Sequence, residues 1–316
     1  MPTMSVNGVR LSYRQVLPDA LAENLGDVVL VHGLAANQAF WNLDLIRTLA
    51  KHYRVTSFDL RGHGYSSRPA KGYSPREMAL DLRELLDRLN IPMAHLVGHS
   101  HGGLISLRLA IDQPRRIRSL TLADTRLRGI APRQILPTQA DWPQLRTRLA
   151  RCGVNLKDDE PEIGMQLLEA IAEPRWAAAR ARLAAAGMFV PFAAQSGGGN
   201  RTAVRWLRLL HETTARADFL GDGQITPESL ASVAFPLLLA YGEHSPHLAS
   251  CRRVGELAPH SRTALINGGG HFHPASRARE FASHLVDFLG QIDRDGDNST
   301  RLAPPRKSDL PRKAPR

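Results

Sequence analysis

Six short apolar runs recur along this chain, and most of them end at glycine, aspartate or histidine. The runs are VVLVH (28–32), RVTSFD (54–59), AHLVG (94–98), SLTLAD (119–124), PLLLAYG (236–242) and TALIN (263–267). Near-continuous apolar runs of this length are typical of strands that are covered on both faces. The pattern therefore predicts a mostly parallel sheet buried between helices.

Helical patterns lie between these runs. Residues 75–90 place apolar side chains on one face, Ser74 can cap the helix and Pro75 suits its first turn. A second helix is expected to follow the run at 94–98 and to end at Pro114, and a third to occupy about residues 275–289. Strands that alternate with helices predict an α/β fold with a doubly wound sheet.

The alternation is interrupted between the fourth and fifth runs, where Ala-, Leu- and Arg-rich helical stretches occur and no strand pattern is evident. We therefore expect an all-helical cap insertion at 126–232, placed between core segments 1–125 and 233–290. Residues 291–316 are rich in proline and charge, and they are expected to form a disordered basic tail.

Charge and cysteine content limit the choice of partners. The formal net charge is +11, but the basic residues are dispersed, so no nucleic-acid partner is expected. The two cysteines, Cys152 and Cys251, have no metal-ligand spacing. No secretion signal and no run of ~20 apolar residues is evident, which predicts a cytoplasmic protein without a membrane span. Its expected partner is a small-molecule substrate; its oligomeric state stays open.

The stretch LVGHSHGG (96–103) places a serine between two histidines at the end of a predicted strand. Ser100 has Gly98 and Gly102 on either side, in the G-x-S-x-G pattern of a nucleophile elbow. Side chains at both glycine positions would clash in a sharp strand-to-helix turn. The following helix would offer its N-terminus to negative charge. Ser100 is thus a candidate nucleophile; the alternative is a plain tight turn with an exposed serine.

Three further stretches accompany this elbow in order. They are HGLAANQAFW (32–41), DLRGHGYS (59–66) and NGGGHFHP (267–274). With them the chain resembles the α/β-hydrolase fold superfamily over essentially residues 1–290. The resemblance implies a serine hydrolase with a helical cap, in which the second of these loops is scaffold and the third carries the catalytic histidine.

The resemblance also implies the partners of Ser100. His271 follows a predicted strand and three glycines, which is the expected place of the base, and His273 is the second choice. His99 and His101 flank the serine, but we expect their side chains to point away from its hydroxyl. The oxyanion donors would be the backbone N–H groups of Leu34 and His101.

The acid departs from the family's usual pattern. Its usual position, in the stretch YGEHSPHL (241–248), holds Ser245, which cannot carry a negative charge. Asp124, at the end of the run 119–124, is the first candidate, although it could instead cap a helix. Glu243 is the alternative acid.

These residues predict a serine hydrolase (carboxylesterase-like) that cleaves an ester, thioester or lactone of a small, largely apolar substrate through an acyl-enzyme. The first alternative is a C–C bond hydrolase of a ring-cleavage product or β-diketone, and the second is a non-catalytic ligand-binding receptor on the same fold. Neither a metal nor an organic cofactor is implied. Serine at position 100 disfavours the relatives with an aspartate nucleophile, the haloalkane dehalogenases and soluble epoxide hydrolases.

Overall fold

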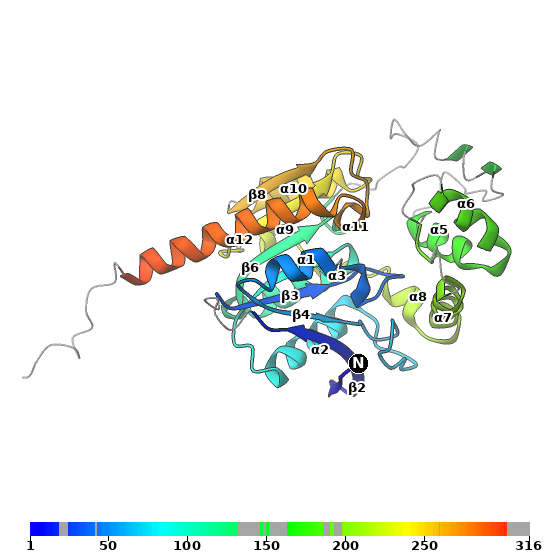
Figure 1. Cartoon of the computed structure of the whole chain (residues 1–316), viewed down its shortest axis with the longest axis horizontal. Coiled ribbons are helices and arrows are strands. Elements are labelled where there is room, and N and C mark those ends of the chain that lie inside the picture. The colour runs from blue at the N-terminus through cyan, green and yellow to red at the C-terminus, as the bar shows by residue number, and fades with distance from the viewer. Residues whose placement is uncertain are drawn as a thin grey trace, which may run out of the picture.

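The computed structural model shows an α/β fold built on a mostly parallel sheet (Figure 1), as predicted. It describes residues 1–18, 25–41, 43–131, 146–147, 150–151, 163–185, 190–192, 198–258 and 260–301. Within these residues the sheet has eight strands in the order β1-β2-β4-β3-β5-β6-β7-β8. The strands are β1 (Thr3–Val6), β2 (Val9–Val16), β3 (Asp27–Val31), β4 (Arg54–Phe58), β5 (Ala94–His99), β6 (Ile117–Ala123), β7 (Leu237–Gly242) and β8 (Ser261–Ile266).

All six predicted strands are present, as β3 to β8, and neighbouring members of this set pair in parallel. The antiparallel hairpin β1–β2 at the sheet edge was not predicted. Its strands alternate polar and apolar residues, because one face of an edge hairpin can remain in water. Asn7 and Gly8 form its turn with φ of 44° and 73°, and an Asn-Gly pair is the sequence signal that could have revealed it.

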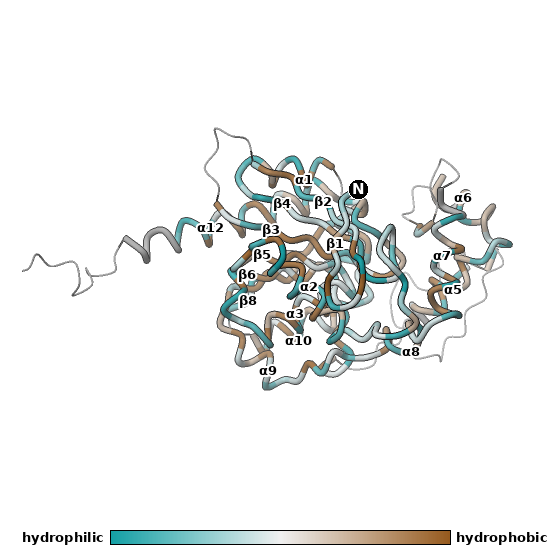
Figure 2. Tube along the Cα trace, turned by 90° about the horizontal axis from the view of Figure 1, so that it is seen from below, coloured by the Kyte–Doolittle hydropathy of each residue, from teal (hydrophilic) through white to brown (hydrophobic). Residues whose placement is uncertain are grey.

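Helices cover both faces of the sheet, and successive strand residues face opposite layers. Val29 and Val31 of β3 pack in one core cluster with helices α2 and α3, whereas Val28 and Leu30 pack in the other with α1 and α12. The central strand β3 is accordingly apolar over most of its length (Figure 2). The core-layer helices are α1 (Leu43–Leu49), α2 (Pro75–Arg88), α3 (His101–Asp112), α10 (Leu248–Leu257), α11 (His273–Ser276) and α12 (Ala278–Arg301).

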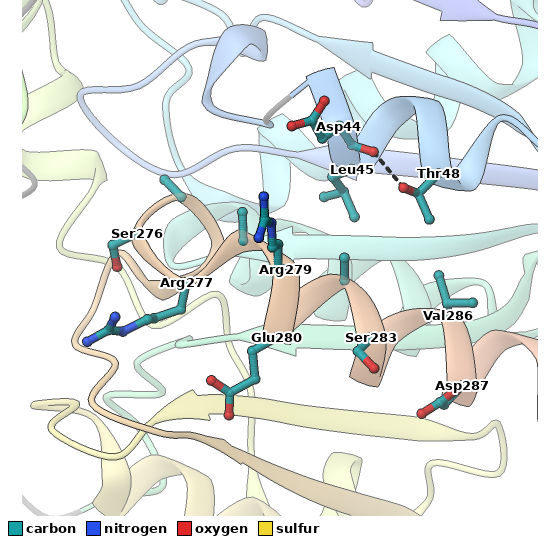
Figure 3. Close-up of a pocket in the computed structure, with 13 residues that line it drawn as sticks. Asp44, Leu45, Thr48, Ser276, Arg277, Arg279, Glu280, Ser283, Val286 and Asp287 are labelled. Atoms are coloured by element: carbon teal, nitrogen blue, oxygen red, sulfur yellow. Dashed lines mark hydrogen bonds between the residues drawn. The ribbon is translucent and has the colours of Figure 1, made fainter.

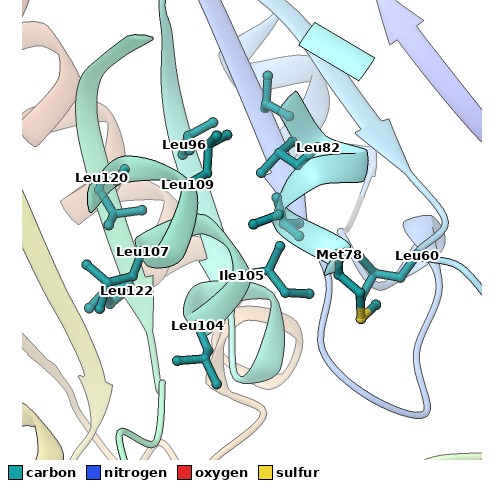
Figure 4. Close-up of a cluster of buried hydrophobic side chains, with 14 of the residues drawn as sticks. Leu60, Met78, Leu82, Leu96, Leu104, Ile105, Leu107, Leu109, Leu120 and Leu122 are labelled. Carbon is teal, nitrogen blue, oxygen red and sulfur yellow. The ribbon is translucent and has the colours of Figure 1, made fainter. Parts of the chain in front are cut away.

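The packing of α3 fixes the strand-to-helix turn that precedes it. Leu104, Ile105 and Leu107 are at most 3% exposed and lie among side chains of α2, β5 and β6 (Figure 4). Burying a side chain of this size stabilises the fold by about 1.5–3 kcal/mol, so this helix face holds α3 firmly on the sheet. Helix α2 begins as expected, because Ser74 Oγ accepts the Glu77 N–H and Pro75 occupies the first turn.

Between β6 and β7 the described residues form helices and no strand. The elements are α5 (Ile163–Ala172), η4 (Pro174–Trp176), α6 (Ala177–Ala185), α7 (Gly198–Glu212), α8 (Ala215–Asp218) and α9 (Pro227–Ala231). Helices α5, α6 and α7 gather beyond the carboxyl ends of the strands (Figure 1). Much of the predicted cap insertion, 126–232, lies outside the described residues, so its boundaries stay a prediction.

Helix α7 rests on the loop that follows β4. Arg68 forms an ion pair with Glu212 at 2.7 Å, and Arg205 donates to the carbonyl oxygen of Gly64 at 3.2 Å. A Cβ added to Gly62 would lie 2.6 Å from a methyl group of Leu209, which shows how closely this loop meets the helix. The loop DLRGHGYS therefore joins the insertion to the core.

Helix α12 is longer than predicted, since it continues past residue 289 to Arg301. The predicted start of a disordered tail at 291 is therefore too early, and residues 302–316 lie outside the described residues. Asp293 explains the difference, because its carboxylate accepts from Tyr53 Oη at 2.5 Å and lies 2.7 Å from the Arg118 guanidinium. Of the described helices, none combines the length and apolar character that a bilayer span requires.

Candidate active site

Ser100 lies at the sharp turn between β5 and α3. Its φ and ψ are 53° and −119°, a conformation that costs a non-glycine residue about 1–3 kcal/mol. A Cβ on Gly98 would lie 2.5 Å from the Cα of Gly103, and one on Gly102 would lie 2.3 Å from the carbonyl oxygen of Val31. The two glycines of G-x-S-x-G are thus required by close backbone contacts.

Ser100 also precedes the first turn of α3, where backbone N–H groups and the helix dipole favour negative charge. Its side chain makes no capping hydrogen bond to this helix. The hydroxyl is therefore not used to stabilise the helix end, unlike that of Ser74 in α2.

His271 and Asp124 meet at the carboxyl ends of β8 and β6. The Nδ1–H of His271 donates to Asp124 Oδ1 at 2.8 Å, and the two residues are separated by 147 positions in the sequence. Asp124 is fully buried and also accepts from Ser245 Oγ at 2.7 Å and from the Gly242 N–H at 3.1 Å. None of these bonds is a helix cap, and together they aim one carboxylate oxygen at His271.

Glu243, the alternative acid, lies elsewhere. Its side chain is 53% exposed and accepts the Gly268 N–H at 2.8 Å. Of the two candidate carboxylates, the structure brings only Asp124 to His271.

Burial alone would favour the neutral carboxyl form of Asp124. The hydrogen bond from His271 and the imidazoles of His271, His247 and His273 outweigh that effect and hold the pKa of Asp124 below its usual value. The carboxylate is therefore ionised at neutral pH and can stabilise a positive charge on His271.

The other candidate histidines have separate partners. His99 donates through Nε2 to the backbone oxygen of His271 at 2.9 Å and stacks on Phe40. This bond holds the loop of His271 against the residue before Ser100. His273 donates through Nε2 to Ala240 O at 3.1 Å. Burial is the main reason that the pKa of His99 is well below its usual value and that of His273 is about 4, so both are neutral.

The loop after β3 lies beside the serine. A Cβ on Gly33 would be 3.0 Å from the Cβ of Ser100. His32 fixes this loop, because its Nδ1–H donates to Gly33 O at 2.8 Å and its Nε2 accepts the Leu60 N–H at 3.0 Å. Among the described residues no hydrogen bond uses the N–H of Leu34 or of His101.

Two residues near Asp124 were not given a role from the sequence. Ser245 donates to Asp124 Oδ1 and its oxygen accepts the His247 N–H at 2.9 Å. The His247 ring stands almost perpendicular to that of His271, with centroids 4.9 Å apart. Burial and the neighbouring His271 lower the pKa of His247 to about 3. Their place in YGEHSPHL, the stretch that lacks the usual acid, was the available signal.

A surface hollow lies elsewhere, between α1 and the segment α11–α12 (Figure 3). Asp44, Thr48, Arg279 and Asp287 are among its lining residues, whereas Ser100, Asp124 and His271 are not.

Comparison with known proteins identifies the family of the fold. The profile described as the alpha/beta hydrolase fold matches residues 27–275. "Putative carbamate hydrolase RutD" of Variovorax paradoxus is 30% identical over 285 residues, covering 85% of this chain and 93% of that protein. The enol-lactonase of Burkholderia xenovorans has a similar fold, with a TM-score of 0.65 and 24% identity over 92% of this chain and 100% of its own.

The meta-cleavage product hydrolase CumD of Pseudomonas fluorescens is similar in structure as well, with a TM-score of 0.61. Its identity is 21%, and the match covers 92% of this chain and 98% of that one.

Proposed function

The chain belongs to the α/β-hydrolase family, and from this premise we propose that it is a serine hydrolase whose nucleophile is Ser100. The observation that carries the proposal is the hydrogen bond between His271 Nδ1 and the buried Asp124. It lies at the carboxyl ends of the strands, where Ser100 occupies its strained turn. A serine hydroxyl is a weak nucleophile and needs a neighbouring base, which His271 supplies.

In the proposed reaction, Ser100 Oγ attacks the acyl carbon while His271 Nε2 accepts the hydroxyl proton. His271 then gives this proton to the leaving group, and water, activated by the same imidazole, releases the acyl group from Ser100. Asp124 keeps the proton of the neutral ring on Nδ1, so that Nε2 has a lone pair for Ser100. Its negative charge then stabilises the imidazolium that forms.

The oxyanion of the tetrahedral intermediate would accept hydrogen bonds from the N–H groups of Leu34 and His101. Two observations support this assignment. Gly33 brings the first loop against Ser100, and neither N–H group is used elsewhere among the described residues. Preorganised donors of this kind stabilise the transition state by about 2.7–4 kcal/mol each.

The proposed substrate is a small, largely apolar ester, thioester or lactone. Phe40 and Phe272 flank the histidines of the site, and Phe219 of the insertion meets the His101 ring at 5.3 Å. This contact supports a role of the insertion as a cap over the residue next to Ser100. The relative RutD, named for carbamate hydrolysis, adds carbamates to the acyl compounds that should be tested.

The test combines a substrate panel with an active-site label. Chromogenic acyl esters of graded length, thioesters, lactones and aryl carbamates are assayed beside a ring-fission product, whose turnover would favour C–C hydrolysis instead. A fluorophosphonate probe should label the wild type and not Ser100→Ala, which should lose about 10⁴-fold or more in kcat. Ser232→Ala, at an exposed serine, is the control that keeps both properties.

Labelling that persists in Ser100→Ala would refute the assignment of the nucleophile. Tight ligand binding without labelling or turnover in the wild type would indicate a receptor rather than an enzyme.

A further inference from the structure

His247 is half-buried and has no role in the proposed reaction, although its ring lies beside that of the proposed base, His271. One ligand atom each from Asp124, His247 and His271 lies within 4.8 Å of the other two. The three side chains come from the loops after β6, β7 and β8. These strands are neighbours in the sheet and run parallel, so the three loops lie side by side at the carboxyl ends of the strands.

Two imidazole nitrogens and one carboxylate oxygen are a donor set that suits Zn²⁺, which binds three protein ligands and leaves a fourth position open. Bonds of about 2.0–2.2 Å in a tetrahedral site place the ligand atoms about 3.3 Å apart. His271 Nδ1 and Asp124 Oδ1, now 2.8 Å apart, would separate slightly, and the His247 ring would move inward.

Neighbouring groups already orient these ligands. Ser245 donates to Asp124 Oδ1 and accepts the backbone N–H of His247, and the Gly242 N–H holds Asp124 Oδ2. Such outer contacts are what fixes ligand geometry in metal sites. The His271 side chain is 22% exposed, which gives an ion a route from solvent.

We propose that Asp124, His247 and His271 form a binding site for a divalent transition metal such as Zn²⁺, and that occupation of this site switches the hydrolase off. In the neutral ring the proton would leave Nδ1, where it now faces Asp124, and Nε2 would take one up in its place. Nδ1 then has a lone pair that binds the ion, and the ring keeps one proton, so no net proton is released. A protonated Nε2 has no lone pair, and it cannot accept the proton of Ser100.

The site is tested first by binding, which does not depend on the proposed function. Co²⁺ serves as a spectroscopic stand-in for Zn²⁺ and is titrated into the full chain without an affinity tag. Visible absorption of tetrahedral Co²⁺ should appear and should be displaced by Zn²⁺. His247→Gln should weaken binding by about 10-fold or more, since even the loss of an outer contact has that effect.

His244→Gln is the matched control, because this histidine lies in the same loop with a side chain 54% exposed and should leave the affinity unchanged. Equal affinities of the His247→Gln and His244→Gln proteins would overturn the site, and so would the absence of Co²⁺ absorption in the wild type.

The switch rests on the proposed function and is tested by labelling of Ser100. Zn²⁺ should slow fluorophosphonate labelling of the wild type, a chelator should restore it, and His247→Gln should be less sensitive than His244→Gln. Metal binding without any effect on labelling would overturn the switch. Failure to label even in chelator would instead count against the serine mechanism and leave the binding result intact.

Discussion

Replacing Asp124 by asparagine tests the proposed acid most directly, because the structure defines every bond that the new amide must replace. Asp124 accepts from His271 Nδ1 and Ser245 Oγ through one oxygen and from the Gly242 N–H through the other. If the amide oxygen faces His271, the NH₂ group faces the Gly242 N–H. Two hydrogen-bond donors then face each other, and neither has an acceptor there. The reverse orientation points the NH₂ group at His271 and selects the tautomer with the proton on Nε2.

Either orientation removes the charge that stabilises the imidazolium. The equivalent change in other Ser-His-Asp enzymes lowers kcat about 10⁴-fold, which corresponds to about 5.4 kcal/mol in the activation free energy. In the first orientation, the buried donor–donor contact at Gly242 should also lower the free energy of unfolding by about 1–3 kcal/mol. We therefore expect Asp124→Asn to be folded, slightly less stable and nearly inactive.

Glu243→Gln is the matched control, since a glutamine oxygen can still accept the Gly268 N–H at this half-exposed position. Its effect should stay within about 0.5 kcal/mol, or about twofold in rate. The assay is kcat/KM on the best ester of the panel, with Tm measured for each variant. Losses of similar size in the two variants would refute the assignment of Asp124.

Three further predictions concern the scaffold. Gly102→Ala should lower stability by about 1–3 kcal/mol or more in denaturant unfolding and abolish turnover, because its Cβ would meet a backbone oxygen at 2.3 Å. Deletion of residues 302–316 should leave turnover and Tm unchanged. Asp293→Asn should instead lower stability by about 1–3 kcal/mol, because it weakens the contacts of this side chain with Tyr53 and Arg118; equal Tm values in the wild type and both variants would contradict this. Burial lowers the pKa of His32 to about 4 and that of His63 to about 3. Below pH 6.5 these histidines take up protons on unfolding, so Tm should fall as the pH is lowered from about 6.5 to 4. A Tm that stays constant over this range would contradict the prediction.

Local sequence patterns predicted most of the sheet and the turn of Ser100. Runs such as VVLVH identify buried strands because their burial depends on a short, continuous stretch of chain. The hairpin β1–β2 has no continuous apolar run, because one face of its strands stays in water; its signals are the alternating residues and the Asn7–Gly8 turn. The end of α12 depends on Tyr53, which lies 240 positions from Asp293, and no local signal reports such a contact.

The amino-acid sequence by itself determined the strand-turn-helix that presents Ser100, because Gly98, Gly102 and the flanking apolar residues act within a few positions of each other. Only the tertiary structure decided which carboxylate reaches His271. Asp124 and Glu243 each follow a buried strand, so the sequence ranked Asp124 first but left Glu243 as an alternative. The choice depends on how the loops after β6, β7 and β8 fold over the carboxyl ends of the strands. There a 2.8 Å hydrogen bond joins His271 to Asp124, 147 positions away in the sequence. The same convergence places His247 beside His271, and spacing along the chain does not encode it.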